Sequence, residues 1–488
     1  MKKIYLQNSR TLEILFGIVV LGFIFYWSAY LSVSSVAPSS IPVHHDDYSL
    51  YAAGGEAFRL SWIRPLSYFY MHVLSTAGPD WFAWSVRLLC VWYVLLVWLL
   101  LQDVVDKRFN NYFILPFGVA IFSSPIIVDN ARYMGVVTQL LSGCLGLWSA
   151  WMVLTAARKS DQTKTALRWL ALSGLLIILS TLAKEGYVLL YVFSLLYAIY
   201  RWKPSLKLFL PMGLGFAFIS GSFILGAKVL AGSAFLGVND PSSTYYVNLN
   251  PLSILQTIGV YLTGGNHPAM RVHGAVIVVL NIVIVGLLVS RLRLRRQFHP
   301  SVYLMACAFI VMAPYTVLPN HVYPYYEILW IPFFIACFLS LISDFKSRSD
   351  RPSSFVGARL PIAIMVGLAL IFSVADFKGR QGIARWYDSM ALENQKLLRE
   401  IQSKSKKIQK VKSACIKGAS MFSPWYLHDA GYLKYVMEID ATWFVMSREG
   451  EPTHSGLKAG ADTSRNRTVL ITEYGDAPSD CVRIEFSK

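Results

Sequence analysis

Long apolar runs separated by short polar connections dominate this chain. A helix needs about 20 apolar residues to cross the hydrocarbon core of a bilayer. Runs near that length lie at about 12–31, 85–102, 112–128, 133–156, 169–183, 187–200, 208–231, 274–290, 301–318, 325–342 and 360–375. The pattern predicts an α-helical polytopic membrane protein with about eleven transmembrane helices. The first run is too long for a signal-peptide core and lacks a small-residue cleavage site, so we expect it to be retained as a helix.

The basic residues predict how these helices are oriented. The formal net charge of +17 could indicate nucleic-acid binding, but the cations gather in alternate connections between the apolar runs. By the positive-inside rule these clusters and the N-terminus face the cytoplasm. Topology therefore accounts for most of the charge, and we expect no nucleic-acid partner. The clusters are Lys107/Arg108, Arg158/Lys159/Lys164/Arg168, Arg201/Lys203/Lys207, Arg291/Arg293/Arg295/Arg296 and Lys346/Arg348/Arg351/Arg359.

The chain divides into a transmembrane domain, 1–375, and a polar C-terminal region, 376–488. With an odd helix count the C-terminal region lies outside the cytoplasm. Its basic start would favour the cytoplasm, but long domains translocate largely regardless of charge. Residues 391–410 predict a helix, and 469–472 and 481–486 predict strands, so we expect a small α/β domain. Cys415 and Cys481, the two cysteines outside the apolar runs, favour an oxidising compartment and a disulfide.

Candidate chemistry begins in the first outward loop, 32–84. Asp46 and Asp47 are adjacent carboxylates, and they fit either a reactive site or a solvated loop that tolerates charge. His44 and His45 precede them, and these two histidines are either ligands of a divalent metal ion or interfacial residues. Arg64 follows in the same loop, before Pro65 and Leu66.

The later outward connections, 129–132, 184–186, 232–273 and 319–327, hold further candidates. Asp129 and Arg132 either serve the site or form a helix cap and an internal ion pair. Lys184 and Glu185 could neutralise each other, although an idle pair at that depth is costly. For His321 both a phosphate or metal role and a solvated imidazole are open, and the tyrosines around it, Tyr323 and Tyr326, are typical of an interfacial aromatic belt.

Together these residues suit sugar transfer from a phosphate carrier. That reaction needs a carboxylate to take the acceptor proton and cations to stabilise the departing phosphate. Asp46 or Asp47 could act as the base, and Arg64, Arg132 and Lys184 could bind phosphate. The chain contains no P-loop, no GxGxxG and no CxxC, so we expect no nucleotide and no organic cofactor.

The order and side of these motifs resemble the GT-C superfamily of membrane glycosyltransferases, which includes the lipid A aminoarabinose transferases and protein O-mannosyltransferases. The resemblance implies a catalytic acidic pair at Asp46 and Asp47. Arg64-Pro65-Leu66, with Tyr68 close behind, is similar to the family signature that often reads Lys-Pro-Pro-Leu. In this chain Arg replaces the lysine and one proline is missing.

The resemblance extends to the later connections. A second acidic residue before an Arg-Tyr pair is matched by Asp129, Arg132 and Tyr133. The lysine that the family uses on the carrier phosphate is matched by Lys184. Its late His/Tyr element is matched by His321 and Tyr325, which the resemblance assigns to the same phosphate.

We therefore expect an inverting glycosyltransferase of a bacterial inner membrane, with its C-terminal domain periplasmic or extracellular. It would take a sugar from a polyprenyl-phosphate donor, in contact with membrane lipids, and add it to lipopolysaccharide, a cell-wall glycan or an exported protein. An O-antigen ligase or polymerase is one alternative, but its late loop would be rich in arginine, whereas 232–273 offers Arg271 with two histidines. A transporter or flippase is the other, and the near-absence of charge within the apolar runs disfavours it.

Overall fold

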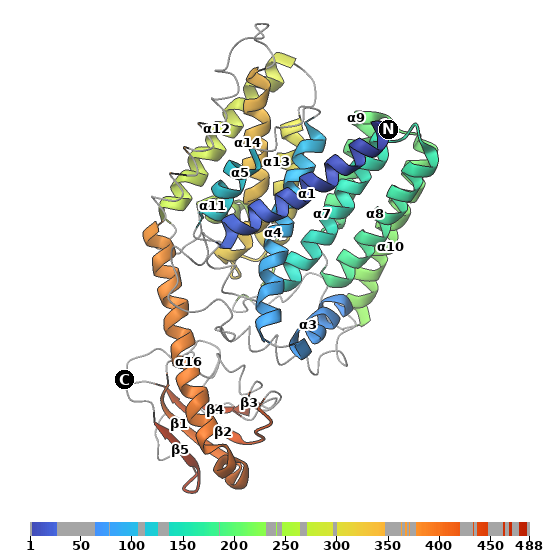
Figure 1. The fold of residues 1–488 in the computed structure, drawn as a ribbon. Helices are drawn as coiled ribbons and strands as arrows, with labels where there is room; N and C mark the ends of the chain where they lie inside the picture. The colour runs from blue at the N-terminus through green and yellow to red at the C-terminus, as the bar shows by residue number, and fades with distance from the viewer. Residues whose placement is uncertain are drawn as a thin grey trace.

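The protein is a helical bundle joined by one long helix to a small sheet (Figure 1). The chain begins at the end of the bundle far from the sheet, and the short helix α3 (Pro65–Ala77) lies at the end nearer the sheet. This computed structural model describes residues 2–26, 64–77, 79–105, 113–124, 136–184, 186–230, 241, 246–263, 271–295, 300–346, 363, 367, 370, 377–419, 433, 437–447, 462–463, 468–470 and 478–485.

The apolar runs up to residue 342 coincide with helices. The helices of the bundle besides α3 are α1 (Lys2–Tyr26), α4 (Pro79–Val104), α5 (Ile114–Phe122), α7 (Val137–Arg158), α8 (Thr163–Ala183), α9 (Val188–Trp202), α10 (Leu206–Leu230), α11 (Pro251–Leu262), α12 (Arg271–Arg295), α13 (Pro300–Thr316), the 3₁₀ helix η6 (Pro324–Leu329) and α14 (Ile331–Lys346). Of the last predicted run, 360–375, only residues 363, 367 and 370 are described, and each is helical.

Two details of the predicted pattern need correction. The run 325–342 is not one helix, because η6 ends at Leu329 and α14 begins at Ile331. Pro332 lacks an amide hydrogen and its ring would clash with the carbonyl of residue 328, which favours a break in the helix just before it. The predicted outward loop 232–273 also contains a helix, α11, which Asn250 caps through its side-chain oxygen and the amide of Leu252.

The helices identify a membrane protein. Among the described residues, four helical segments are long and apolar enough to cross a bilayer: Trp84–Val104, Val137–Arg158, Thr163–Ala183 and Leu206–Gly226. Shorter apolar helices accompany them, so the count of about eleven spans stays a prediction. Large apolar side chains such as Phe218 on α10 and Ile282 on α12 are 76% and 66% exposed, as suits surfaces that face lipid.

Helix α7 is the most enclosed of these segments and packs against α4, α8 and α9. A Cβ atom built on Gly143 would lie 2.7 Å from the hydroxyl of Tyr187 and 2.7 Å from the ring of Tyr93, so only glycine permits this approach. Ser149 donates a hydrogen bond of 2.6 Å to the carbonyl of Ser173 and ties α7 to α8. In a lipid-facing bundle such contacts replace the hydrophobic effect as the force between helices.

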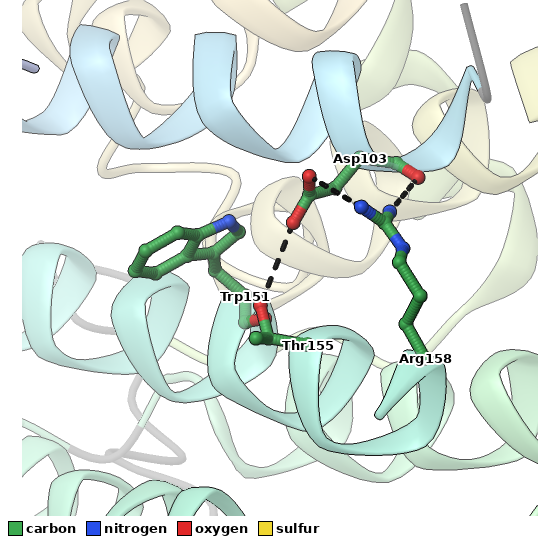
Figure 2. A network of polar contacts seen from close by, with 4 residues as sticks. All are labelled: Asp103, Trp151, Thr155 and Arg158. Atoms are coloured by element: carbon green, nitrogen blue, oxygen red, sulfur yellow. Dashed lines mark hydrogen bonds and ion pairs between the residues drawn. The ribbon is translucent and has the colours of Figure 1, made fainter. Parts of the chain in front are cut away.

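A buried ion pair joins α4 to α7 at the C-terminal ends of both helices (Figure 2). The guanidinium of Arg158 lies 2.9 Å from a carboxylate oxygen of Asp103, and it also donates to the backbone carbonyl of Asp103. Thr155 donates to the second carboxylate oxygen at 3.5 Å. Arg158 also lies over the ring of Trp202, 5.4 Å from its centroid, which connects the pair to α9. Arg158 therefore connects α7 to α4 and α9, in addition to belonging to one of the basic clusters.

The C-terminal region is a helix packed on a five-stranded sheet. The helix α16 (Phe377–Val411) is longer than the predicted 391–410, and it buries Leu397, Ile401 and Ile408 against the strands. The sheet order is β3-β4-β2-β1-β5, parallel except for the edge pair β3·β4. The strands are β1 (Ser413–Ala419), β2 (Thr442–Ser447), β3 (Asp462–Thr463), β4 (Thr468–Leu470) and β5 (Val482–Glu485).

The two predicted strands are present as β4 and β5, but β1, β2 and β3 were not predicted. Residues 413–416 of β1 are all buried, because a central strand of a parallel sheet is covered on both faces and shows no alternation of apolar and polar residues. A disulfide joins Cys415 of β1 to Cys481, just before β5, with their Cα atoms 5.9 Å apart. This bond closes a separation of 66 residues across two neighbouring strands.

Candidate functional site

The site is organised by the C-terminal end of α8. A helix ends with backbone carbonyls that lack partners within the helix. Here Ser67 of α3 donates to the carbonyl of Ala183 at 2.7 Å, and Ser142 of α7 donates to the carbonyl of Lys184 at 2.8 Å. The amide of Gly186 donates to that same Lys184 carbonyl at 3.0 Å. Small hydroxyl side chains from two other helices therefore fix the backbone of Lys184.

The side chain of Lys184 is half-buried and lies over the ring of Tyr315, with Nζ 5.9 Å from the ring centroid. A cation at this place also interacts favourably with the negative end of the α8 dipole. Tyr315 belongs to the last turn of α13, so this contact joins α8 to an element more than one hundred residues further along the chain.

Arg64 approaches the same tyrosine from the first outward loop. It immediately precedes α3, and its carbonyl accepts a hydrogen bond from the amide of Tyr68 at 3.1 Å. The guanidinium is close enough to Tyr315 to interact electrostatically with its phenol. Ser67 anchors α3 to the end of α8, and that bond is what brings Arg64 and Lys184 to one place.

Tyr315 is in turn packed against a histidine and tyrosine pair. Its ring centroid lies 4.3 Å from that of Tyr326, whose hydroxyl shares a hydrogen bond of 2.8 Å with Nε2 of His321. Gln139 of α7 donates to the same hydroxyl at 3.4 Å. His321 is 8% exposed and Tyr326 is 3% exposed, so this pair is held inside the protein.

Residues of α11, α4 and η6 surround the His321–Tyr326 pair and hold it in place. Tyr261 of α11 donates to the backbone carbonyl of His321 at 3.4 Å and packs edge-on against Trp330. Tyr93 of α4 donates to the carbonyl of Leu329 at 2.6 Å and fixes the end of η6. Glu327, with no exposed surface, lies in the same 3₁₀ helix and interacts electrostatically with Tyr261.

This arrangement suits an anionic ligand. Two basic side chains act on Tyr315: Lys184 lies over its ring and Arg64 interacts with it electrostatically. His321 with Tyr326 supplies groups that can donate hydrogen bonds. In a water-poor site such fixed charges and donors act on developing negative charge far more strongly than they would in water. Tyr70 of α3 is half-buried. That burial raises the pKa of Tyr70, so its phenol stays neutral at physiological pH.

The structure thus brings together three of the predicted phosphate-binding residues, Arg64, Lys184 and His321. For Tyr325 it describes the backbone, within η6, and not the side chain. The other candidates lie outside the described residues. They are His44, His45, Asp46, Asp47, Asp129 and Arg132, together with Glu185, the possible partner of Lys184.

Tyr315 and Tyr326 are the site residues that the sequence analysis missed. The assignment of Tyr326 to an interfacial aromatic belt is wrong, because its ring is buried and its hydroxyl is bonded to His321. The five-residue separation of His321 and Tyr326 gave a weak signal, since the intervening Pro324 begins a 3₁₀ turn that folds the chain back. No local pattern indicates Tyr315, which looks like any aromatic residue near a helix end.

A metal ion at this cluster is not supported by its donors. Among the described residues no three His, Cys, Asp or Glu side chains lie together as metal ligands would. The predicted ligands His44 and His45 lie outside those residues.

No protein-family profile and no curated protein sequence matches the chain. Among solved structures, it is similar to the Archaeoglobus fulgidus oligosaccharyltransferase in the apo form, with a TM-score of 0.48 and 13% identity over 86% of this chain and 64% of that one. The chain is also similar to the archaeal oligosaccharyltransferase AglB of the same organism, in complex with an inhibitory peptide and a dolichol-phosphate. The TM-score is 0.48, with 13% identity over 86% of this chain and 63% of that one.

ArnT from Cupriavidus metallidurans, in the apo state, gives a TM-score of 0.42 and 10% identity over 89% of this chain and 86% of that one. The chain spans less than two thirds of the length of the archaeal enzymes. These are structures of the GT-C superfamily, which the sequence motifs resemble. The likeness is one of coarse architecture, and the function is inferred from the site residues themselves.

Proposed function

We propose that the protein is a glycosyltransferase that moves a sugar from a polyprenyl-phosphate carrier to an acceptor at the outer face of a bacterial inner membrane. The observation that carries this proposal is the placement of Lys184 over Tyr315, beside the His321–Tyr326 pair, with the Arg64 end of α3 anchored to the end of α8 through Ser67. These residues come from four separate parts of the chain. A cluster of cations and hydrogen-bond donors in an apolar bundle fits the phosphate of a lipid-linked donor.

The phosphate is the leaving group in this reaction. An acceptor hydroxyl attacks the anomeric carbon on the side opposite the phosphate, so the configuration at that carbon is inverted. The bond between the anomeric carbon and the phosphate oxygen breaks, and its electron pair leaves with the phosphate. Arg64 and Lys184 stabilise the charge that gathers there, with Arg132, His321 and Tyr325 as further contacts in the proposal.

The acceptor proton needs a base. We assign it to Asp46 or Asp47 of the first outward loop, with Asp129 as a second carboxylate in the next loop. Arg64 belongs to the same predicted outward loop as Asp46 and Asp47, 17 residues after Asp47. A positioned general base contributes about 100- to 10,000-fold to rate. The acceptor in this proposal is a glycan, a lipid or an exported protein.

The proposed topology puts the N-terminus in the cytoplasm and the C-terminal domain in the periplasm. Two features support it. The N-terminus lies at one end of the bundle, whereas α3 lies at the end nearer the sheet (Figure 1). The disulfide between Cys415 and Cys481 suits an oxidising compartment.

The test is an assay of purified protein with a polyprenyl-phosphate sugar, in which release of polyprenyl phosphate is measured for two lysine variants. Lys184→Met should lower kcat about 100- to 1,000-fold, the effect of removing one electrostatic stabiliser of a leaving group. Lys164→Met is the matched control, because Lys164 lies exposed at the opposite end of the same helix, and it should leave kcat within about twofold.

Two results would contradict the proposal. If Lys184→Met keeps the normal dependence on donor, Lys184 is a partner of Glu185 and not a phosphate ligand. If the wild-type protein consumes no donor but moves the intact lipid-linked sugar across a vesicle membrane, the protein is a transporter.

A further inference from the structure

The exposed face of α16 carries an unusual concentration of cations. Within 396–412 there are seven Lys and Arg residues and a single acidic residue, Glu400, which gives this segment a net charge of +6. The cations fully on the surface are Lys396, Arg399, Lys406, Lys407, Lys410 and Lys412. The predicted location outside the cytoplasm means that the positive-inside rule does not account for them.

Three of these cations form a straight line, which we call the basic ridge: Arg399, Lys406 and Lys410. Their spacings of seven and four residues place them within about 40° of one another around a helix of 3.6 residues per turn. The buried residues Leu397 and Ile401 lie on the opposite side, against the sheet. The ridge therefore points away from the domain, and it extends for about 16 Å at 1.5 Å per residue.

The acidic residue of this segment does not neutralise the ridge. Glu400 lies 3.7 Å from Lys404, one turn further along the helix. The amine of Lys404 also donates to the carbonyl of Arg483 at the edge strand β5, at 2.9 Å. The pair Glu400–Lys404 is thus directed toward the sheet, and the ridge keeps its full positive charge on the surface.

The ridge is also far from the membrane. The predicted last span ends at about residue 375, and α16 then runs away from the bundle as one continuous helix (Figure 1). Arg399 lies 22 residues after Phe377, or about 33 Å along the helix. Charges in water are screened over about 8 Å at physiological salt, so lipid headgroups at the bilayer surface are out of electrostatic reach.

We propose that the basic ridge binds an anionic polysaccharide, one that carries repeated phosphate or carboxylate groups, and holds it as the acceptor of sugar transfer. A ridge about 16 Å long is too extended for one phosphate or carboxylate, and it fits a chain of anions that projects from the membrane. This inference rests on the proposed function and topology, and it narrows the acceptor from glycan, lipid or protein to an anionic glycan.

The test measures binding and not transfer. Full-length protein in nanodiscs of neutral lipid is exposed to phosphomannan and, as a control, to neutral mannan of the same length. The triple variant Arg399→Gln, Lys406→Gln and Lys410→Gln should weaken phosphomannan binding about tenfold at 50 mM salt, the order expected when three exposed charge pairs are lost. The matched variant Arg399→Lys, Lys406→Arg and Lys410→Arg keeps the charges and should bind within about twofold of wild type.

Equal phosphomannan binding by the wild type and the neutralised variant would overturn the proposal. So would a ridge-dependent attachment to phosphatidylglycerol vesicles without phosphomannan binding, since that would identify lipid as the ligand. Release of polyprenyl phosphate with a small neutral acceptor separates this inference from the proposed function. That activity should be the same in the wild type and the neutralised variant. If neither protein releases polyprenyl phosphate, the proposed transferase function is refuted, whereas binding of an anionic glycan by the basic ridge is not.

Discussion

The ion pair between Asp103 and Arg158 gives a prediction that depends on which partner is removed. The two side chains are unequally buried: that of Asp103 is 6% exposed and that of Arg158 is 32% exposed. Arg158→Met would leave a carboxylate enclosed between α4 and α7. Asp103→Asn would leave a guanidinium that still reaches water and still stacks on Trp202.

The magnitude follows from this geometry. At 2.9 Å and an effective dielectric constant of about 20, the attraction is about 6 kcal/mol before the cost of desolvating both charges. Removing one partner of a buried pair costs about 3–5 kcal/mol, because the other charge stays buried. We expect Arg158→Met to lie in that range. Asp103→Asn should cost about 1–3 kcal/mol, the range for a polar group that loses one partner.

The assay compares the heat-unfolding midpoints of the purified variants in one detergent. Lys164→Met is the control for loss of an exposed cation from α8, and it should not move the midpoint. The double variant Asp103→Asn and Arg158→Met should lose less stability than the sum of the single variants, because residues in contact are coupled. If Asp103→Asn is as damaging as Arg158→Met, or if the double variant is additive, the unequal burial of the two charges does not decide their energetics.

Two further predictions concern the site and the C-terminal domain. Tyr326→Phe removes the hydroxyl bonded to His321 and should reduce kcat about tenfold, with a loss of stability of about 1–3 kcal/mol because buried His321 and Gln139 lose this partner. The exposed Tyr323→Phe is its control, and an equal loss in both variants would contradict a specific role for Tyr326. Cys415→Ser should destabilise the C-terminal domain by about 4 kcal/mol in the chain-entropy model, measured by limited proteolysis. Labelling of intact wild-type cells with an impermeant thiol reagent, with and without reductant, tests its placement, because new labelling of Cys481 only after reduction requires the domain to be outside.

The sequence by itself determined the class of the protein and the position of its helices. A chain that enters lipid must satisfy its backbone hydrogen bonds locally, so the described part of each apolar run up to residue 318 lies in a helix, and the run 325–342 forms η6 and α14. The sequence also identified Arg64, Lys184 and His321 as candidate phosphate-binding residues, because charged or titratable residues beside apolar runs are few. The strands β4 and β5 and most of α16 were predicted as well, and in β5 buried and exposed residues alternate as the period of a strand requires.

Only the tertiary structure decided which of these residues meet. The bond from Ser67 to the end of α8 joins Arg64 to Lys184, yet nothing near Ser67 in the sequence points to a partner 116 residues away. The burial of Tyr326, the contact of Lys184 with Tyr315 and the pairing of Asp103 with Arg158 likewise depend on how helices distant in the chain pack. Local pattern reports whether a residue prefers water or an apolar environment, and the specific neighbour of a buried polar group is fixed by long-range packing.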